Sequence, residues 1–201
     1  MRLTEIRIAG FGGQGVILAA TVIGKAASIY QNAFATMTQS FGPEARGGSS
    51  SASVILSGEA IAYPYVTHPD VLVALSQEAY IRFAPELKPG GTLVVERDLV
   101  RVNGTPSGIR VYSVPATRLA EELGRKMVLN IVLVGFFGAV TGVLDPDALR
   151  RAVSDSVPES FRELNLRAFD KGYDQGATLV HARAESSADL ETWLEWLEQE
   201  V

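Results

Sequence analysis

A glycine-rich turn near the amino terminus constrains the fold of this chain most strongly. Gly10, Gly12 and Gly15 have the G-x-G-x-x-G spacing of a dinucleotide-binding turn. The turn separates a short apolar run from an apolar, alanine-rich stretch, which predicts a strand at about 3–9 and a helix at about 15–30. The glycines allow close backbone approach, and the start of the helix offers unpaired N–H groups to an anion.

The acidic residue that would bind the ribose of NAD is missing. It is expected about 20 residues after the turn, yet no Asp or Glu lies between Glu5 and Glu44. The turn alone therefore does not lead us to infer NAD or FAD.

A second glycine-rich loop, at 39–51, follows a strand predicted at 32–38. Ligands bind at the carboxyl ends of the strands in an open α/β sheet, so both loops should face one crevice. Backbone N–H groups, serine hydroxyls and the guanidinium of Arg46 suit a phosphate or a carboxylate.

The remaining segments alternate between strand and helix patterns. The strands are predicted at 52–56 and 59–62 (a hairpin around 57–58), 71–75, 92–96 and 109–114, and the helices at 77–87, 117–123, 145–153 and 158–173. This alternation predicts an α/β, Rossmann-like three-layer domain with a mostly parallel sheet.

An uncharged segment at 127–144 approaches the length of a membrane span. Asn130 and Thr141 interrupt it, and three glycines lower its hydrophobicity. We therefore expect a buried helix that packs closely through its glycines, and no membrane partner.

The end of the chain differs in character from the rest. Residues 177–201 are predicted to form an acidic, amphipathic, helical extension, with Ser186 and Asp189 as a capping box. One helical face would carry Leu190, Trp193, Leu194, Leu197 and Val201, with Trp196 beside it. This helix either folds back on its own domain or docks on a partner subunit.

The composition excludes several classes of function. A net charge of -5 gives no basic surface for nucleic acid, and the absence of cysteine excludes thiolate zinc sites and cysteine-ligated iron–sulfur clusters in this chain. His68 and His181 have no accompanying catalytic motif, so we assign no catalytic residue and no metal ligand. The first predicted strand begins almost at the amino terminus, so we expect no signal peptide and a cytoplasmic location.

Two motifs in order, GFGGQGV at 10–16 and SFGPEARGG at 40–48, resemble the gamma subunit of 2-oxoacid:ferredoxin oxidoreductases. Similarity continues through PDVLVALS at 69–76 and KPGG at 88–91, and it covers 1–176 as a gamma-type domain.

The resemblance implies a subunit of a thiamine-diphosphate-dependent complex that converts a 2-oxoacid and coenzyme A (CoA) into an acyl-CoA and carbon dioxide while reducing an acceptor. Thiamine diphosphate would lie between alpha and beta partner subunits. Iron–sulfur clusters would lie on partner subunits, with or without a ferredoxin-like chain among them. The gamma domain would help to enclose CoA at the subunit interface.

CoA carries a pyrophosphate and a ribose phosphate, so it needs N–H donors and positive charge. The candidate residues are Gly12, Gly13, Gln14, Gly15, Ser40, Arg46, Gly47 and Gly48. Gln14 could instead cap backbone groups inside its loop, and Arg46 could form an ion pair with a partner chain. Two other classes stay open: a stand-alone FAD or NAD(P) oxidoreductase, and a purely structural scaffold subunit.

Replacement of Arg46 tests its two functional interpretations together. We expect Arg46→Ala either to raise the apparent KM for CoA, because a phosphate loses its guanidinium, or to weaken assembly with partner subunits. Steady-state kinetics and size-exclusion chromatography measure the two effects. If neither changes, both interpretations are wrong.

Overall fold

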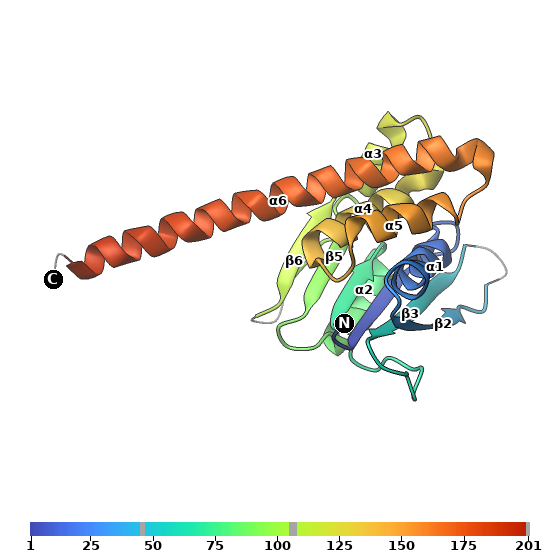
Figure 1. The fold of residues 1–201 in the computed structure, drawn as a ribbon, viewed down its shortest axis with the longest axis horizontal. Helices are drawn as coiled ribbons and strands as arrows, with labels where there is room; N and C mark the ends of the chain where they lie inside the picture. Colours follow the sequence, from blue (N-terminus) through green and yellow to red (C-terminus); the bar gives the residue numbers. More distant parts are fainter. Residues whose placement is uncertain (45–46, 105–107, 200–201) are drawn as a thin grey trace.

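The structure, a computed structural model, describes residues 1–44, 47–104 and 108–199, and for 186–199 it describes the helical backbone only. Within these residues a six-stranded sheet carries helices on both faces (Figure 1). The strands are β1 (Thr4–Phe11), β2 (Phe34–Phe41), β3 (Ser49–Ser57), β4 (Val71–Ala74), β5 (Thr92–Glu96) and β6 (Arg110–Val114). The helices are α1 (Val16–Lys25), α2 (Gln77–Phe83), α3 (Ala116–Glu122), α4 (Leu129–Thr141), α5 (Pro146–Ser154) and α6 (Glu159–Gln199), with short helical turns at Ala26–Tyr30, Ala84–Glu86 and Lys126–Val128.

The strand order is β2-β3-β1-β4-β5-β6. β1, β4, β5 and β6 pair in parallel, whereas β3 is antiparallel to both β1 and β2. β2 therefore runs in the same direction as β1, and its carboxyl end reaches the same edge of the sheet. This arrangement confirms the predicted α/β, Rossmann-like fold with a mostly parallel sheet.

The hairpin predicted around 57–58 is wrong. Residues 59–62 form no strand, and the hairpin is instead β2 and β3, which residues 42–48 connect. The serine run that begins β3 has weak strand propensity, but its backbone pairs with β1 on one side and β2 on the other: Ser49 lies opposite Phe11, and Ser50 lies opposite Phe41. Tertiary pairing therefore extends both strands into the segment predicted as loop.

α4 is the buried helix predicted at 127–144. Its backbone passes so close to α6 that a Cβ atom on Gly135 would lie 2.1 Å from the Phe169 carbonyl oxygen, and one on Gly172 would lie 1.9 Å from that of Val132. The predicted close packing is confirmed at Gly135 and Gly138, whereas Gly142 meets no atom within 4 Å and ends α4 in the left-handed conformation. Among the described residues, none of the helices combines the length and apolarity that a membrane crossing requires.

α6 is one continuous helix, where two helices were predicted. Gly172 and Gly176 lie inside this helix and do not break it. They face the α4 backbone and Ala139, which leave no space for a side chain at either position. The separate start predicted at Ser186 is wrong, since the helical backbone passes this position without interruption. Figure 1 shows the far end of α6 standing clear of the sheet, which excludes a tail that folds back. The division of the chain at residue 176 stays a prediction.

The close contact between α4 and α6 predicts that a substitution by alanine destabilises the protein at Gly172 but not at Gly24, a glycine outside this contact. We expect Gly172→Ala to lower the free energy of unfolding by about 3 kcal/mol or more, because the new methyl group meets backbone that cannot move aside. Gly24→Ala, inside α1 with no atom within 4 Å of the new Cβ, should raise it by about 0.5–1 kcal/mol. Urea denaturation followed by circular dichroism measures both, and equal effects would contradict the packing argument.

Candidate functional site

The first glycine turn joins the end of β1 to the start of α1. Gly13 and Gly15 have φ angles of 92° and 74°, which a residue with a side chain adopts only with strain. Gly15 is the N-cap of α1, and no side chain caps the helix or places an acidic group in its first turn. The N–H groups of the first turn of α1 therefore stay available to a ligand.

Asn130 of α4 contacts this turn from the interior of the protein. Its side-chain amide donates to the Gly15 carbonyl oxygen at 3.4 Å, and a Cβ atom on Gly15 would lie 2.4 Å from that amide nitrogen. Asn130 is 3% exposed, so it is a buried polar group that the turn satisfies. The sequence showed only an interruption of an apolar helix, which did not reveal this contact.

Gln14 points into the protein. Its Oε1 accepts from the Phe11 N–H at 2.6 Å, and its Nε2 donates to the Leu75 carbonyl oxygen at 3.0 Å. The side chain thus ties the end of β1 to the segment after β4. These are the backbone bonds of the capping role weighed for Gln14, and its ligand role stays a prediction.

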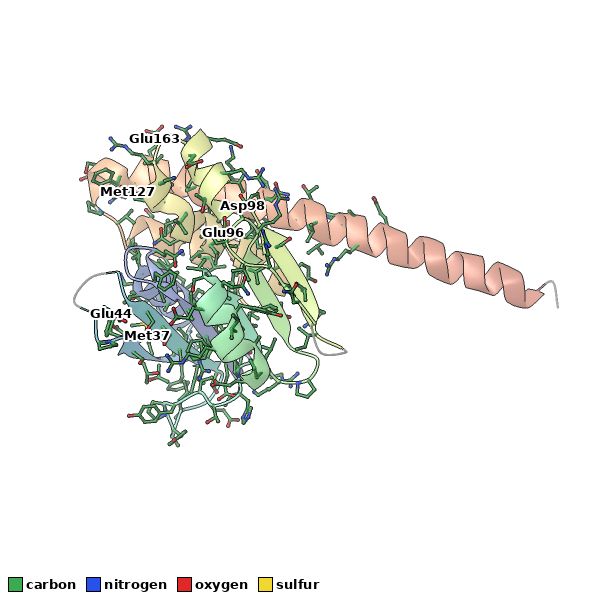
Figure 2. The ribbon with its side chains drawn as sticks, turned by 180° about the vertical axis from the view of Figure 1, so that it is seen from behind. Met37, Glu44, Glu96, Asp98, Met127 and Glu163 are labelled. Carbon is green, nitrogen blue, oxygen red and sulfur yellow. The ribbon has the colours of Figure 1, made fainter. Side chains whose placement is uncertain are left out.

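The two glycine loops meet, as predicted. The Gly12 N–H donates to the Gly48 carbonyl oxygen at 2.8 Å, and a Cβ atom on Gly12 would lie 3.2 Å from the Gly47 nitrogen. Glu44 lies at the hairpin loop, with its carboxylate against Gly42 and Gly48 (Figure 2). Arg46, the predicted cation of this loop, lies outside the described residues.

A cavity of about 620 Å³ opens over these loops, and we call it the glycine cavity. Its described lining includes Gly12, Gly13, Gly15, Gly47, Gly48, Glu44, the hairpin residues Phe41, Gly42, Ser49 and Ser50, and Val16, Ile17 and Leu18 of α1. Five of the predicted site residues therefore line one cavity at the open end of a helix. The Gly12 N–H is used in the bond to Gly48, so the N–H groups for a ligand would come from the other loop glycines and the first turn of α1.

Ser40 lies on the other face of the hairpin. It lines a second cavity, of about 250 Å³, between β2, β3 and α2, which we call the serine cavity. Ser76, Arg82 and Phe83 line it as well, and sequence reasoning missed all three. The position of Ser76 directly after β4, at the ligand-binding edge of the sheet, was the signal available for it.

Arg82 and Arg7 lie against the same aromatic ring. Their guanidinium carbons are 5.0 Å and 4.8 Å from the centre of the Phe83 ring. Arg7 is buried, forms an ion pair with Glu86 and donates to the Val66 carbonyl oxygen at 2.5 Å. Burial lowers the pKa of the Arg7 guanidinium, and the charge of Arg82 lowers this pKa further.

Glu96 is a fully buried acid at the carboxyl end of β5, beside Asp98 (Figure 2). Its carboxylate accepts the N–H groups of Asp98, Leu99 and Thr117 at 2.7, 2.9 and 3.1 Å. Because backbone donors occupy both oxygens, Glu96 anchors the turn after β5 and the start of α3 and is not placed to transfer a proton.

Solved structures share this architecture. The gamma subunit of keto/oxoacid ferredoxin oxidoreductase from Geobacter sulfurreducens is 40% identical, with a TM-score of 0.77 over 87% of this chain and 99% of that one. A 2-oxoglutarate:ferredoxin oxidoreductase from Magnetococcus marinus, solved with 2-oxoglutarate, CoA and succinyl-CoA bound, is 26% identical, with a TM-score of 0.76 over 89% of this chain and 32% of that one. The fold and its glycine loops thus define a Rossmann-like gamma subunit of an oxidoreductase.

The chain belongs to the pyruvate ferredoxin/flavodoxin oxidoreductase family, which matches residues 5–175. It is 45% identical to the 2-oxoglutarate synthase subunit KorC of Methanocaldococcus jannaschii over 85% of this chain and 92% of that subunit. The chain is thus a subunit of a 2-oxoacid:ferredoxin oxidoreductase complex, as the resemblance implied, and the stand-alone oxidoreductase is not supported.

The two bonds of Gln14 predict that a carboxylate cannot replace its amide. We expect Gln14→Glu to lower the free energy of unfolding by about 1–3 kcal/mol, because a carboxylate cannot donate to the Leu75 carbonyl oxygen. Gln39→Glu, on the exposed edge of β2, should change it by less than about 0.5 kcal/mol. Thermal denaturation at neutral pH compares the two variants, and equal stabilities would show that the Gln14 bonds contribute nothing.

Proposed function

We propose that this chain helps to enclose CoA in its complex by holding the pyrophosphate in the glycine cavity. The complex would convert a 2-oxoacid, CoA and an oxidised acceptor into an acyl-CoA, carbon dioxide and a reduced acceptor. The observation that carries the proposal is the contact of Gly12 with Gly48, which sets two glycine loops beside the uncapped start of α1.

The chemistry of the cavity supports this assignment. A pyrophosphate needs several N–H donors at close range, and glycine lets the backbone approach it without side chains between. The volume of about 620 Å³ accommodates the nucleotide part of a CoA molecule, while the rest would extend toward partner subunits. The CoA that is bound in the Magnetococcus marinus enzyme, a relative with the same fold, is consistent with this role.

The remaining cofactors belong to other chains in this proposal. Alpha and beta subunits would hold thiamine diphosphate, and further subunits, with or without a ferredoxin-like chain, would hold the iron–sulfur clusters. The absence of cysteine here supports this division, since such clusters need thiolate ligands. This chain would bind and orient CoA and exclude water, while the bond-making steps occur on its partners.

A methyl group at the contact between the two loops tests the proposal. In the complex purified from its own cells, we expect Gly12→Ala to raise the apparent KM for CoA about tenfold, or ~1.4 kcal/mol. The new Cβ would meet the Gly47 nitrogen and spread the loops. The KM for the 2-oxoacid should stay within about twofold, because that substrate is bound elsewhere.

Gly24→Ala is the matched control, since Gly24 does not line the glycine cavity. An unchanged KM for CoA in the assembled Gly12→Ala complex would favour the scaffold alternative. In that case loss of Trp193 and Trp196 should break assembly, while the loop substitutions leave activity intact.

A further inference from the structure

The serine cavity adjoins the glycine cavity across the hairpin. The two cavities share Phe41, Gly42, Ser49 and Ser50, so only the hairpin lies between them. Both cavities lie at the carboxyl edge of the sheet, so a ligand that contacts both has to pass over this edge and carry two anionic groups, one for each cavity. CoA is such a ligand, because its ribose joins a pyrophosphate to a separate 3′-phosphate.

Arg82 supplies a positive charge without an ion-pair partner among the described residues at the wall of the serine cavity. Its side chain is exposed, and no carboxylate of the described residues lies within ion-pair distance of it. Arg7, on the other hand, is paired with Glu86. Stacking on Phe83 holds the Arg82 guanidinium while its N–H groups stay free to donate.

Serine hydroxyls complete the set of donors in this cavity. Ser40, Ser51 and Ser76 come from three different segments and line it together with Arg82. The Ser76 oxygen accepts from the Ala79 N–H at 3.1 Å, which leaves its hydroxyl hydrogen free to donate. A guanidinium with several hydroxyl donors matches the charge and the acceptor oxygens of a phosphate monoester.

We propose that Arg82 and the serine cavity bind the 3′-phosphate of CoA while the glycine cavity holds its pyrophosphate. This proposal rests on the function proposed above and makes Arg82 a specificity-determining residue. It predicts that the complex prefers CoA to 3′-dephospho-CoA, which lacks only that phosphate. Glu78, four residues before Arg82 on α2, lines the same cavity and opposes the bound anion.

The experiment compares the KM for CoA with the KM for 3′-dephospho-CoA in the assembled complex. We expect Arg82→Gln to raise the KM for CoA about tenfold and to leave that for 3′-dephospho-CoA within about twofold. Arg82→Lys should lose only part of the preference, since the positive charge is kept. Glu78→Gln should lower the KM for CoA alone, because it removes a repulsive charge.

Arg167→Gln, an exposed arginine of α6, is the matched control and should change neither KM. Equal changes for both substrates in Arg82→Gln would overturn the proposal, as would a wild-type complex that does not distinguish them. Failure of this proposal is separable from failure of the proposed function, because Gly12→Ala should raise the KM for both substrates if the glycine cavity holds the pyrophosphate. If Gly12→Ala raises both KM values while the Arg82 variants change neither, the serine cavity does not bind CoA.

Discussion

The candidate site depends on one hydrogen bond between two distant parts of the chain, from the Gly12 N–H to the Gly48 carbonyl oxygen. This bond forms because β3 lies beside β1 and because β2 runs in the direction of β1, so the hairpin loop arrives at the carboxyl edge of the sheet. Both cavities border this hairpin, one on each face. A shift of the β1–β3 register by one residue would separate the loops and exchange the two faces of β3.

The buried layers supply the rigidity that such a site requires. Gln14 fixes the turn to the segment after β4, and Asn130 fixes it to α4. α4 is in turn held by its contact with α6, where the two backbones approach without side chains between them. A site built from backbone groups has no rotamers to adjust, so its precision comes from these supports.

Some of this architecture was predictable because buried strands leave a recognisable apolar pattern in the sequence. β4 is covered on both faces and reads as a continuous apolar run, and β5 has three apolar residues between Thr92 and Glu96, so both strands were located within one residue at each end. The meeting of the two glycine loops followed from the general position of ligands in open α/β sheets. Ser49 and Ser50, on the other hand, are strand residues only because strands pair with them on both sides, which local sequence does not encode.

The direction in which side chains point was the second feature that the sequence did not predict. Gln14 lies in a glycine turn and Ser40 lies near the end of β2, but the Gln14 side chain turns inward and Ser40 lines the serine cavity. Strand register decides which face a residue meets, and the serine run at 49–51 has no hydrophobic alternation that would specify it. Arg82 was missed for the same reason, since its helix pattern says nothing of the strands that it lies beside.

α6 extends far beyond the domain that it packs against. A helix of 41 residues is about 60 Å long, roughly twice the diameter of a small domain. It contacts the domain as far as Arg183, which donates to the Val111 carbonyl oxygen, and its remaining turns stand clear of the sheet (Figure 1). A rotation of about 5° at its contact with α4 would move a point 30 Å further along the helix by roughly 2.5 Å. The close contact of Gly135 with α6 and of Gly172 with α4 therefore contributes to where the remote end of α6 stands, and a small change in the packing of the core would displace that end.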